Sequence, residues 1–336
     1  MHLEERAIDQ AHGTILLHNV ASAEGRRILK KGTCLAEEDL AKLAEMGRDT
    51  VEVAVLTDAD AHEDEAALAL AKAMETAHLS YTRVFGGRIN LRAEVDGLLE
   101  IDAGRLLAIN SLPGFAVATR RQHTAVGPNQ ATASVASLKI VPYTVARRDL
   151  VRAVELASAR PGIVEVRPFE EGRRVAMLFV AEPAAQARTR DEYLPPTETR
   201  LARLRAEVVA TEAVDLEESA IAAAAARLAA QADLLIVAGQ TSVTHEDDTT
   251  LRALRQAGAE TTLSGAPVDP GTLLALAYWP DTSVLCAPGC AKGLKRNVVD
   301  LVLPRLLLGD RLLRQDVAAL GLGGFLTAAE RGGDIT

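Results

Sequence analysis

The chain has 336 residues, of which 48% are apolar and 25% charged, a composition typical of folded proteins. A formal net charge of −9 and an aromatic content of only 3% argue against a general nucleic-acid-binding or membrane-surface protein, because both need a basic surface. This length predicts two domains. Three cysteines form no disulfide framework, and no signal peptide or membrane-spanning run is apparent, so we expect a cytoplasmic protein.

The first 170 residues predict a smaller, mixed α+β domain. Apolar periodicity predicts helices at 36–47, 64–77, 104–110 and 147–159. Strands are expected at 13–20, 50–56, 97–102 and 162–169. Between about 112 and 146 β-forming residues dominate, and Gly127-Pro128-Asn129 predicts a turn between two strands. The charged stretch 170–174 marks the expected domain boundary.

Residues 171–336 alternate more regularly between strands and helices. Strands are expected at 174–182, 207–214, 233–239 and 282–289. Helices are expected at 197–209, 217–232, 247–258 and 294–310, with a polar loop containing Pro195-Pro196 before the first. Nearly continuous apolar strands between helices predict a C-terminal three-layer α/β/α domain with a mostly parallel sheet. The Ala-rich helix 217–232 fits either the core or a subunit interface.

Ligands of open parallel sheets bind beyond the carboxyl ends of the strands. Three such ends are found here, at 181–183, 239–242 and 288–292. The second and third are rich in small residues, which lets backbone N–H groups approach a ligand, and each precedes a helix whose N-terminus favours anions. Lys292 and Lys295 add positive charge at the third.

Three consecutive acids, Glu246 to Asp248, have two interpretations. Thr244 and Asp247 have the spacing of a helix-capping box. Alternatively, Asp247 or Asp248 faces the crevice and binds Mg²⁺ together with ligand phosphates. A similar His-Glu-Asp string at 62–64 precedes a helix in the first domain, where we interpret it mostly as capping.

Other catalytic motifs are not apparent. Ser242 is not in a G-x-S-x-G context, and the chain lacks a P-loop and a G-x-G-x-x-G after a strand. Cys286 and Cys290 form a C-x-x-x-C pair, but no second Cys/His pair lies near it in sequence to complete a zinc site.

Several stretches resemble a known family. "DLLIVAGQTSVTHEDDTTLRAL" (233–254) and the stretch 264–310 are similar to the MoaB/Mog-type molybdopterin-binding domain. Residues 24–53 resemble the segment that precedes this domain in the gephyrin-like molybdopterin molybdenumtransferases, and 137–145 and 320–326 resemble a divergent branch. Gly239-Gln240 stands where the family has Gly-Gly, and Pro288 to Ala291 where it has Pro-Gly-Asn-Pro.

The resemblance implies a site at these loops. The residues that would cradle the pterin and its phosphate are Gly239, Gln240, Thr241, Ser242, Pro288, Gly289, Cys290, Ala291 and Lys292. Asp247 or Asp248 would match the family's acidic position, as a catalytic residue and Mg²⁺ ligand. Asp269 would lie on the ligand side of the next loop.

The implied function is molybdopterin or molybdenum cofactor binding in cofactor biosynthesis or handling. An enzyme of this kind would resemble a molybdopterin molybdenumtransferase or an adenylyl-handling transferase, with Mg²⁺-assisted molybdenum insertion. The alternative is a non-catalytic carrier or scaffold for a separate cytidylyltransferase or molybdoenzyme partner. A third hypothesis is a hydrolase or other enzyme that keeps this fold but binds a different ligand. The resemblance also implies a homo-oligomer and partners among cofactor biosynthesis enzymes.

Overall fold

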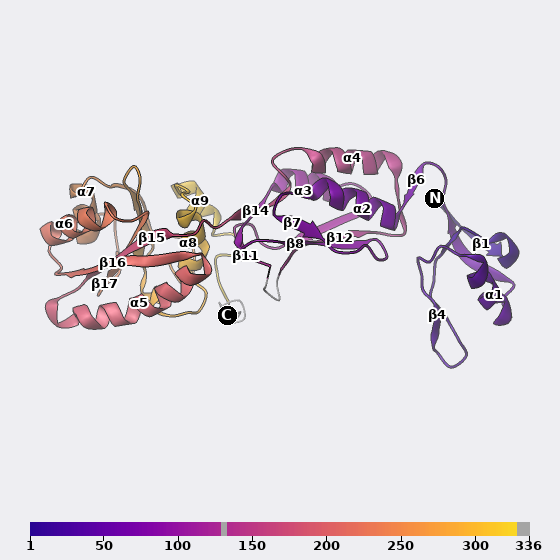
Figure 1. Ribbon diagram of the computed structural model, residues 1–336, viewed down its shortest axis with the longest axis horizontal. Coiled ribbons are helices and arrows are strands. Elements are labelled where there is room, and N and C mark those ends of the chain that lie inside the picture. The colour runs from indigo at the N-terminus through magenta and orange to yellow at the C-terminus, as the bar shows by residue number, and fades with distance from the viewer. Residues whose placement is uncertain (129–132, 328–336) are drawn as a thin grey trace. The chain divides into compact units, whose positions relative to one another are not determined.

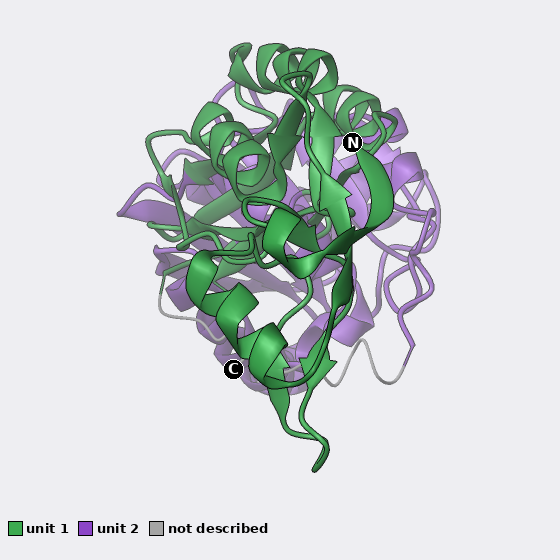
Figure 2. Ribbon diagram, turned by 90° about the vertical axis from the view of Figure 1, so that its right-hand side faces the viewer, with its two compact units in different colours: residues 1–122, 126–167 green, residues 123–125, 168–336 purple. Residues whose placement is uncertain are grey.

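The computed structural model describes residues 1–128 and 133–327. The chain divides into two compact units, shown in different colours in Figure 2. Unit 1 comprises residues 1–122 and 126–167, and unit 2 comprises 123–125 and 168–336. No helix in the described part of the chain is long and apolar enough to cross a membrane.

The first part of unit 1 is a small antiparallel sheet with one helix. Strand β5 (Thr50–Val55) lies between β1 (His2–Ala7) and β2 (Ile15–Leu16), and α1 (Glu37–Glu45) completes the fold. A short helical turn, η1 (Ile8–Gln10), follows β1, and β3 (Val20–Ala21) pairs with β4 (Arg27–Leu29). The strand predicted at 13–20 is therefore two short pieces, because the chain leaves the sheet after Leu16.

The second part of unit 1 is a four-stranded antiparallel sheet with helices packed on it. The order is β10 (Phe115–Thr119), β12 (Ser134–Ile140), β8 (Arg88–Ala93) and β7 (Leu79–Tyr81). A second sheet has the order β11 (Ala125–Val126), β9 (Gly97–Ile101) and β14 (Val164–Pro168), and β6 (Asp60–His62) pairs with β13 (Thr144–Ala146). The helices are α2 (Glu63–Met74), α3 (Ala103–Asn110) and α4 (Arg147–Ser158). The turn predicted at 127–129 lies partly outside the described residues.

Unit 2 is built on a six-stranded sheet that confirms the mostly parallel architecture. Its order is β16 (Ala206–Val214), β15 (Arg173–Val180), β17 (Leu234–Gly239), β20 (Ser283–Ala287), β19 (Ala275–Tyr278) and β18 (Glu260–Ser264). The first four strands are parallel, and the last two join antiparallel. The sequence did not predict β18 and β19, which are short and flanked by turns.

Helices cover both faces of this sheet, which gives the predicted three layers. In Figure 1, α5 (Gln186–Arg203) lies on one side of β15 to β17, and α6 (Glu218–Ala229) and α7 (Thr249–Gln256) lie on the other. The remaining helical elements are η2 (Pro183–Ala185), η3 (Gly289–Lys292), α8 (Val299–Leu307) and α9 (Arg314–Ala319). Ile221 and Leu228 pack α6 into a core with alternate strand residues, so α6 contributes to the core.

Two predicted helices of unit 2 have different bounds in the structure. The expected polar loop around Pro195-Pro196 is instead part of α5, which begins at Gln186 and ends at Arg203 rather than running from 197 to 209. The prolines are tolerated because this helix buries a face against the sheet, including Tyr193 and Leu201. The predicted helix 294–310 corresponds to α8, which begins at Val299 and ends at Leu307. It begins later than predicted because buried side chains hold the preceding residues in a 3-10 turn and an irregular loop.

Candidate functional site

The three predicted loops meet at the carboxyl edge of the parallel strands. The Oγ atom of Ser242, after β17, accepts a hydrogen bond from the Gly289 N–H, after β20, at 3.1 Å. The Oε1 atom of Gln240 accepts from the N–H of Glu182, after β15, at 3.1 Å. The structure therefore connects all three strand ends through side-chain contacts, with the loop after β17 in the middle.

Gly239 is the residue at which the middle loop leaves β17. A Cβ atom at this position would lie 2.4 Å from the carbonyl oxygen of Thr241, a distance that a real Cβ cannot occupy. The loop therefore folds back on itself so tightly that only glycine fits. Beyond it, Gln240 and Thr241 are exposed at the edge of the sheet.

A buried polar cluster holds the loop after β20, and we call Arg200, Asn297 and Asp300 the loop-holding cluster. The Arg200 guanidinium donates to the carbonyls of Ala291 at 3.2 Å and Gly293 at 2.7 Å, and pairs with Asp300 at 2.8 Å. Asn297 donates to the carbonyls of Cys290 and Lys295, at 3.1 and 3.0 Å. The side chains of Arg200 and Asn297 are almost completely buried.

Positive charge is exposed on the same loop. Lys292, Lys295 and Arg296 lie within five residues, and both lysines are exposed. The Lys292 Nζ atom pairs with Glu192 at 2.6 Å and lies 5.1 Å from the centroid of the Tyr193 ring. Burial is the main reason that the pKa of Tyr193 rises to about 12, so this phenol is neutral at ordinary pH. The loop thus offers exposed cations to a ligand, while the buried Tyr193 ring of α5 packs beneath Lys292.

The two cysteines of this region are protonated thiols. Burial raises the pKa of Cys286 to about 12 and that of Cys290 to about 11. A thiolate is the form that binds metals and attacks electrophiles. Within the described residues, no three His, Cys, Asp or Glu side chains are grouped to hold a metal ion. Cys290 therefore offers a ligand a small, uncharged surface.

The acidic trio begins a helix, but differently from the predicted capping box. The N-cap of α7 is Asp248, whose Oδ1 accepts the Thr250 N–H at 2.9 Å, so the prediction of Thr244 as N-cap was wrong. The helix begins later because His245 instead accepts the Asp247 N–H through Nδ1, at 3.1 Å. This turn delays the first helical residue to Thr249.

The surroundings of the two aspartates do not fit a Mg²⁺ site. Asp248 is occupied with capping, and the Asp247 carboxylate lies 3.8 Å from Arg252 and 3.6 Å from Arg255. A divalent cation needs several oxygen ligands, and two guanidinium groups beside Asp247 oppose its binding. The donor set at this position favours capping and surface ion pairs.

Asp269 lies in an exposed loop whose backbone is held by a distant segment. Its N–H donates to the Gly324 carbonyl and its own carbonyl accepts from the Leu326 N–H, both at 2.9 Å. Next to Asp269, the Pro270 carbonyl accepts a hydrogen bond from the Val298 N–H at 3.2 Å, so the Asp269 loop lies beside the segment that follows the loop after β20. This aspartate and the loop therefore share one edge of unit 2.

The sequence reasoning did not identify the members of the loop-holding cluster. Arg200 falls in the predicted helix 197–209, and Asn297 and Asp300 fall in the predicted helix 294–310. No local signal marks Arg200 for burial, because its partners outside α5 are 91 to 100 residues away in the chain. The spacing of Asn297 and Asp300 before an apolar run is the one available sign, since it matches a capping pair.

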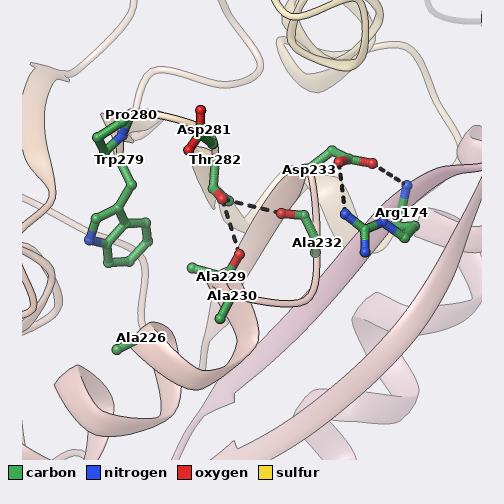
Figure 3. Close-up of a pocket in the computed structure, with 10 residues that line it drawn as sticks. All are labelled: Arg174, Ala226, Ala229, Ala230, Ala232, Asp233, Trp279, Pro280, Asp281 and Thr282. Atoms are coloured by element: carbon green, nitrogen blue, oxygen red, sulfur yellow. Dashed lines mark hydrogen bonds and ion pairs between the residues drawn. The ribbon is translucent and has the colours of Figure 1, made fainter.

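A pocket lies elsewhere on unit 2, as Figure 3 shows. It has a volume of about 370 Å³ and lies at the amino ends of β15, β17 and β20. Trp279 and Asp281 line one part of it, and an Arg174–Asp233 pair, with atoms 3.2 Å apart, lines another. Ligands of parallel α/β sheets bind at the opposite edge, so the carboxyl-edge loops remain the candidate site.

The His-Glu-Asp string of unit 1 begins α2 as a capping segment. His62 is the N-cap and accepts the Asp64 N–H through Nδ1 at 3.2 Å. Glu63 is buried and pairs with Lys139 at 2.7 Å, while Asp64 accepts the Gly87 N–H at 2.5 Å. All three side chains have structural partners, which agrees with the capping interpretation.

The geometry defines an α/β domain with small-residue loops and exposed lysines at the carboxyl edge of its parallel strands. Residues 176–307 match the model of a family described as "Probable molybdopterin binding domain". This match agrees with the resemblance of the same stretch to the MoaB/Mog-type molybdopterin-binding domain. Residues 5–55 match a domain of unknown function. A search of curated proteins found no match.

Solved structures of similar proteins include a molybdenum cofactor biosynthesis protein from Pyrococcus furiosus, at 12% identity and a TM-score of 0.23. That match covers 95% of this chain and 65% of the other, so this chain spans less than two thirds of that protein. The protein CinA of unknown function from Thermoplasma acidophilum shares 12% identity, with coverages of 41% and 99% and a TM-score of 0.34. A putative molybdenum cofactor biosynthesis protein from Corynebacterium diphtheriae shares 15%, with coverages of 41% and 97% and a TM-score of 0.30.

Proposed function

We propose that unit 2 binds molybdopterin, or the molybdenum cofactor, at the loops after β17 and β20, and that the protein acts in molybdenum cofactor biosynthesis or handling. In this proposal residues 171–336 form the ligand-binding domain and residues 1–170 an accessory domain. The pterin contacts Gly239 to Ser242 and Pro288 to Lys292, and Asp269 lies at the rim.

The observation that carries this proposal is the basic segment at the carboxyl edge, within the stretch that matches the family. Lys295 forms no ion pair with any described residue, and Lys292 forms an ion pair with Glu192 only. An unpaired cation such as Lys295 beside small-residue loops favours a phosphate group, because the backbone can approach closely and the charge of this lysine is not neutralised. Molybdopterin carries such a phosphate next to its ring system.

The chemistry at this site is binding and orientation. Protonated Cys290 and neutral Tyr193 add no nucleophile, and the two aspartates have protein partners. Asp247 and Asp248 have no metal-dependent role in this proposal, because their arginine and backbone partners do not fit Mg²⁺. Fixed positioning is what this edge provides to a bound pterin.

The engaged aspartates favour the second candidate, a non-catalytic carrier that passes cofactor to a partner enzyme. A carrier binds the pterin and releases it unchanged, whereas a molybdenumtransferase or adenylyl-handling enzyme alters it. Chromatography of the pterin after incubation with molybdate, ATP and Mg²⁺ distinguishes the two. Unchanged pterin supports the carrier, and a metallated or adenylylated product supports the enzyme.

Calorimetric titration with molybdopterin tests the proposal itself. We expect micromolar or tighter binding, and replacement of Lys295 by alanine to weaken it about tenfold, as for loss of one charged hydrogen bond. Lys72→Ala, at an exposed position of α2 in unit 1, is the matched control. Absence of binding by the unmodified protein would show that the fold serves another ligand. We also propose a homo-oligomer, and a monomer mass in light scattering would contradict that part.

A further inference from the structure

The loop after β20 is held by its carbonyl groups. Four carbonyls between residues 290 and 295 accept hydrogen bonds from the loop-holding cluster: those of Cys290, Ala291, Gly293 and Lys295. A carbonyl oxygen carries partial negative charge and repels a phosphate. Because these oxygens accept hydrogen bonds from buried side chains, they are turned away from a ligand. The exposed lysines of the loop are then the groups that can contact its phosphate.

Arg200 is the member of the cluster that joins the most elements. It lies on α5 and is 3% exposed. Its guanidinium donates to the Pro196 carbonyl within α5, to two carbonyls of the loop, and to both carboxylate oxygens of Asp300 on α8. The planar fork of arginine allows several such acceptors at once, which the single ammonium of lysine cannot satisfy.

Such a buried ion is costly unless every polar group around it is paired. Asp300 meets this condition, because its carboxylate accepts from Arg200 and from the Asn297 N–H at 2.8 Å. Asn297 in turn accepts the Val299 N–H at 2.9 Å. A fully paired network of this kind is rigid, and removing one partner leaves the others buried without hydrogen bonds.

We propose that Arg200 is a positioning residue: through Asp300 and the loop carbonyls, it fixes residues 290–295 in the phosphate-receiving conformation before any ligand arrives. The predicted effect of Arg200 on ligand binding rests on the proposed function, whereas its predicted effect on the loop conformation does not. A preorganised loop loses its conformational entropy during folding rather than on binding. Loss of this preorganisation therefore weakens binding even when the protein still folds.

Arg200→Lys, which keeps the charge and shortens the reach, is the test variant. Arg190→Lys is the matched control, on an exposed position of the same helix. Hydrogen exchange of the ligand-free protein is the first readout. We expect Arg200→Lys to speed exchange of amides in 290–298 about tenfold, as for loss of one charged hydrogen bond, with β15 and β17 unchanged. Unchanged exchange in 290–298, or equal acceleration throughout unit 2, overturns the inference.

The second readout is calorimetry with molybdopterin. We expect Arg200→Lys to bind about tenfold more weakly with a larger unfavourable entropy, while Lys295→Ala binds more weakly with normal exchange. If the unmodified protein does not bind, the proposed function fails and the exchange result still decides the role of Arg200. If Arg200→Lys does not fold, Asp300→Asn takes its place, since it keeps the shape and weakens the same pair.

Discussion

Ser242 and Gly289 join two loops that are 47 residues apart, through a hydrogen bond from the Gly289 N–H to the Ser242 Oγ at 3.1 Å. We predict that Ser242→Ala weakens molybdopterin binding about three- to tenfold while costing unit 2 at most about 1 kcal/mol of unfolding free energy, since the site is partly exposed. Calorimetry and urea unfolding measure the two effects. Thr244→Ala, in the same loop and exposed, should change neither.

Gly239 and Gly289 provide a matched pair of substitutions. A Cβ at Gly239 would lie 2.4 Å from the Thr241 carbonyl, whereas one at Gly289 would meet only the Ser242 Oγ at 3.8 Å. Gly239→Ala should therefore destabilise unit 2 by about 1–3 kcal/mol and abolish tight binding, and Gly289→Ala should fold normally. Equal stability of the two variants in urea unfolding would contradict the tight turn seen at Gly239.

The two aspartates at the start of α7 should differ in their effect on stability. Asp248→Ala removes the N-cap and should cost about 1 kcal/mol, whereas Asp247→Ala removes only exposed ion pairs and should cost about 0.5 kcal/mol or less. The Asp247→Asn/Asp248→Asn double variant keeps a capping residue. We expect its molybdopterin affinity to show the same response to Mg²⁺ as that of the unmodified protein. A lost Mg²⁺ response would restore the metal-binding role.

The buried thiol of Cys286 should make unit 2 less stable at high pH. Burial raises its pKa from 9.0 to about 12, so the unfolded chain loses this proton at a lower pH than the folded one. The stabilisation is complete below pH 9 and is lost as pH rises toward 12. We expect Cys286→Ala to lessen the fall in unfolding free energy between these values by up to about 1.4 kcal/mol per pH unit. Identical slopes for both proteins would refute the assignment.

The Glu63–Lys139 ion pair should contribute to the stability of unit 1 and not to that of unit 2. Lys139→Ala leaves the Glu63 carboxylate buried without its cation, and because the lysine is itself 33% exposed we expect a loss of roughly 2 kcal/mol. The only tryptophan, Trp279, lies in unit 2, so its fluorescence follows that unit while circular dichroism follows both. The variant should shift the dichroism transition and leave the fluorescence transition in place.

Much of unit 2 could be predicted because its central strands, such as β15 and β17, are mostly apolar. The short apolar run Leu234 to Ala238 between two helical patterns indicates a buried strand, and β17 has nearly these bounds. Strand β19 escaped prediction because an apolar run of only four residues, Ala275–Tyr278, does not distinguish a strand from a helix. Strand β18, at the edge of the sheet, escaped because Glu260 to Ser264 is mostly polar. Such an edge strand gains its conformation from its neighbour rather than from its own pattern.

The candidate site could be predicted in its loops but not in what holds them. Small residues after Leu234–Ala238 mark a loop that a ligand can approach, and Lys292 and Lys295 mark its charge. The burial of Arg200 cannot be predicted from the neighbouring sequence. It depends on the carbonyls of Ala291 and Gly293, which lie next to α5 only in the folded protein. Capping by Asp248 rather than Thr244 likewise depends on the turn that His245 forms with Asp247.

The backbone of Asp269 is paired with a segment that lies far from it in the sequence. Two hydrogen bonds, each 2.9 Å long, join Asp269 to the residues on either side of Phe325, whose own side chain is 74% exposed. Both backbone groups of Asp269 are therefore satisfied by residues 324–326 and not by the six-stranded sheet. Truncation before Gly324 would leave this N–H and this carbonyl without their partners, so the conformation of the Asp269 loop depends on a part of the chain outside the sheet.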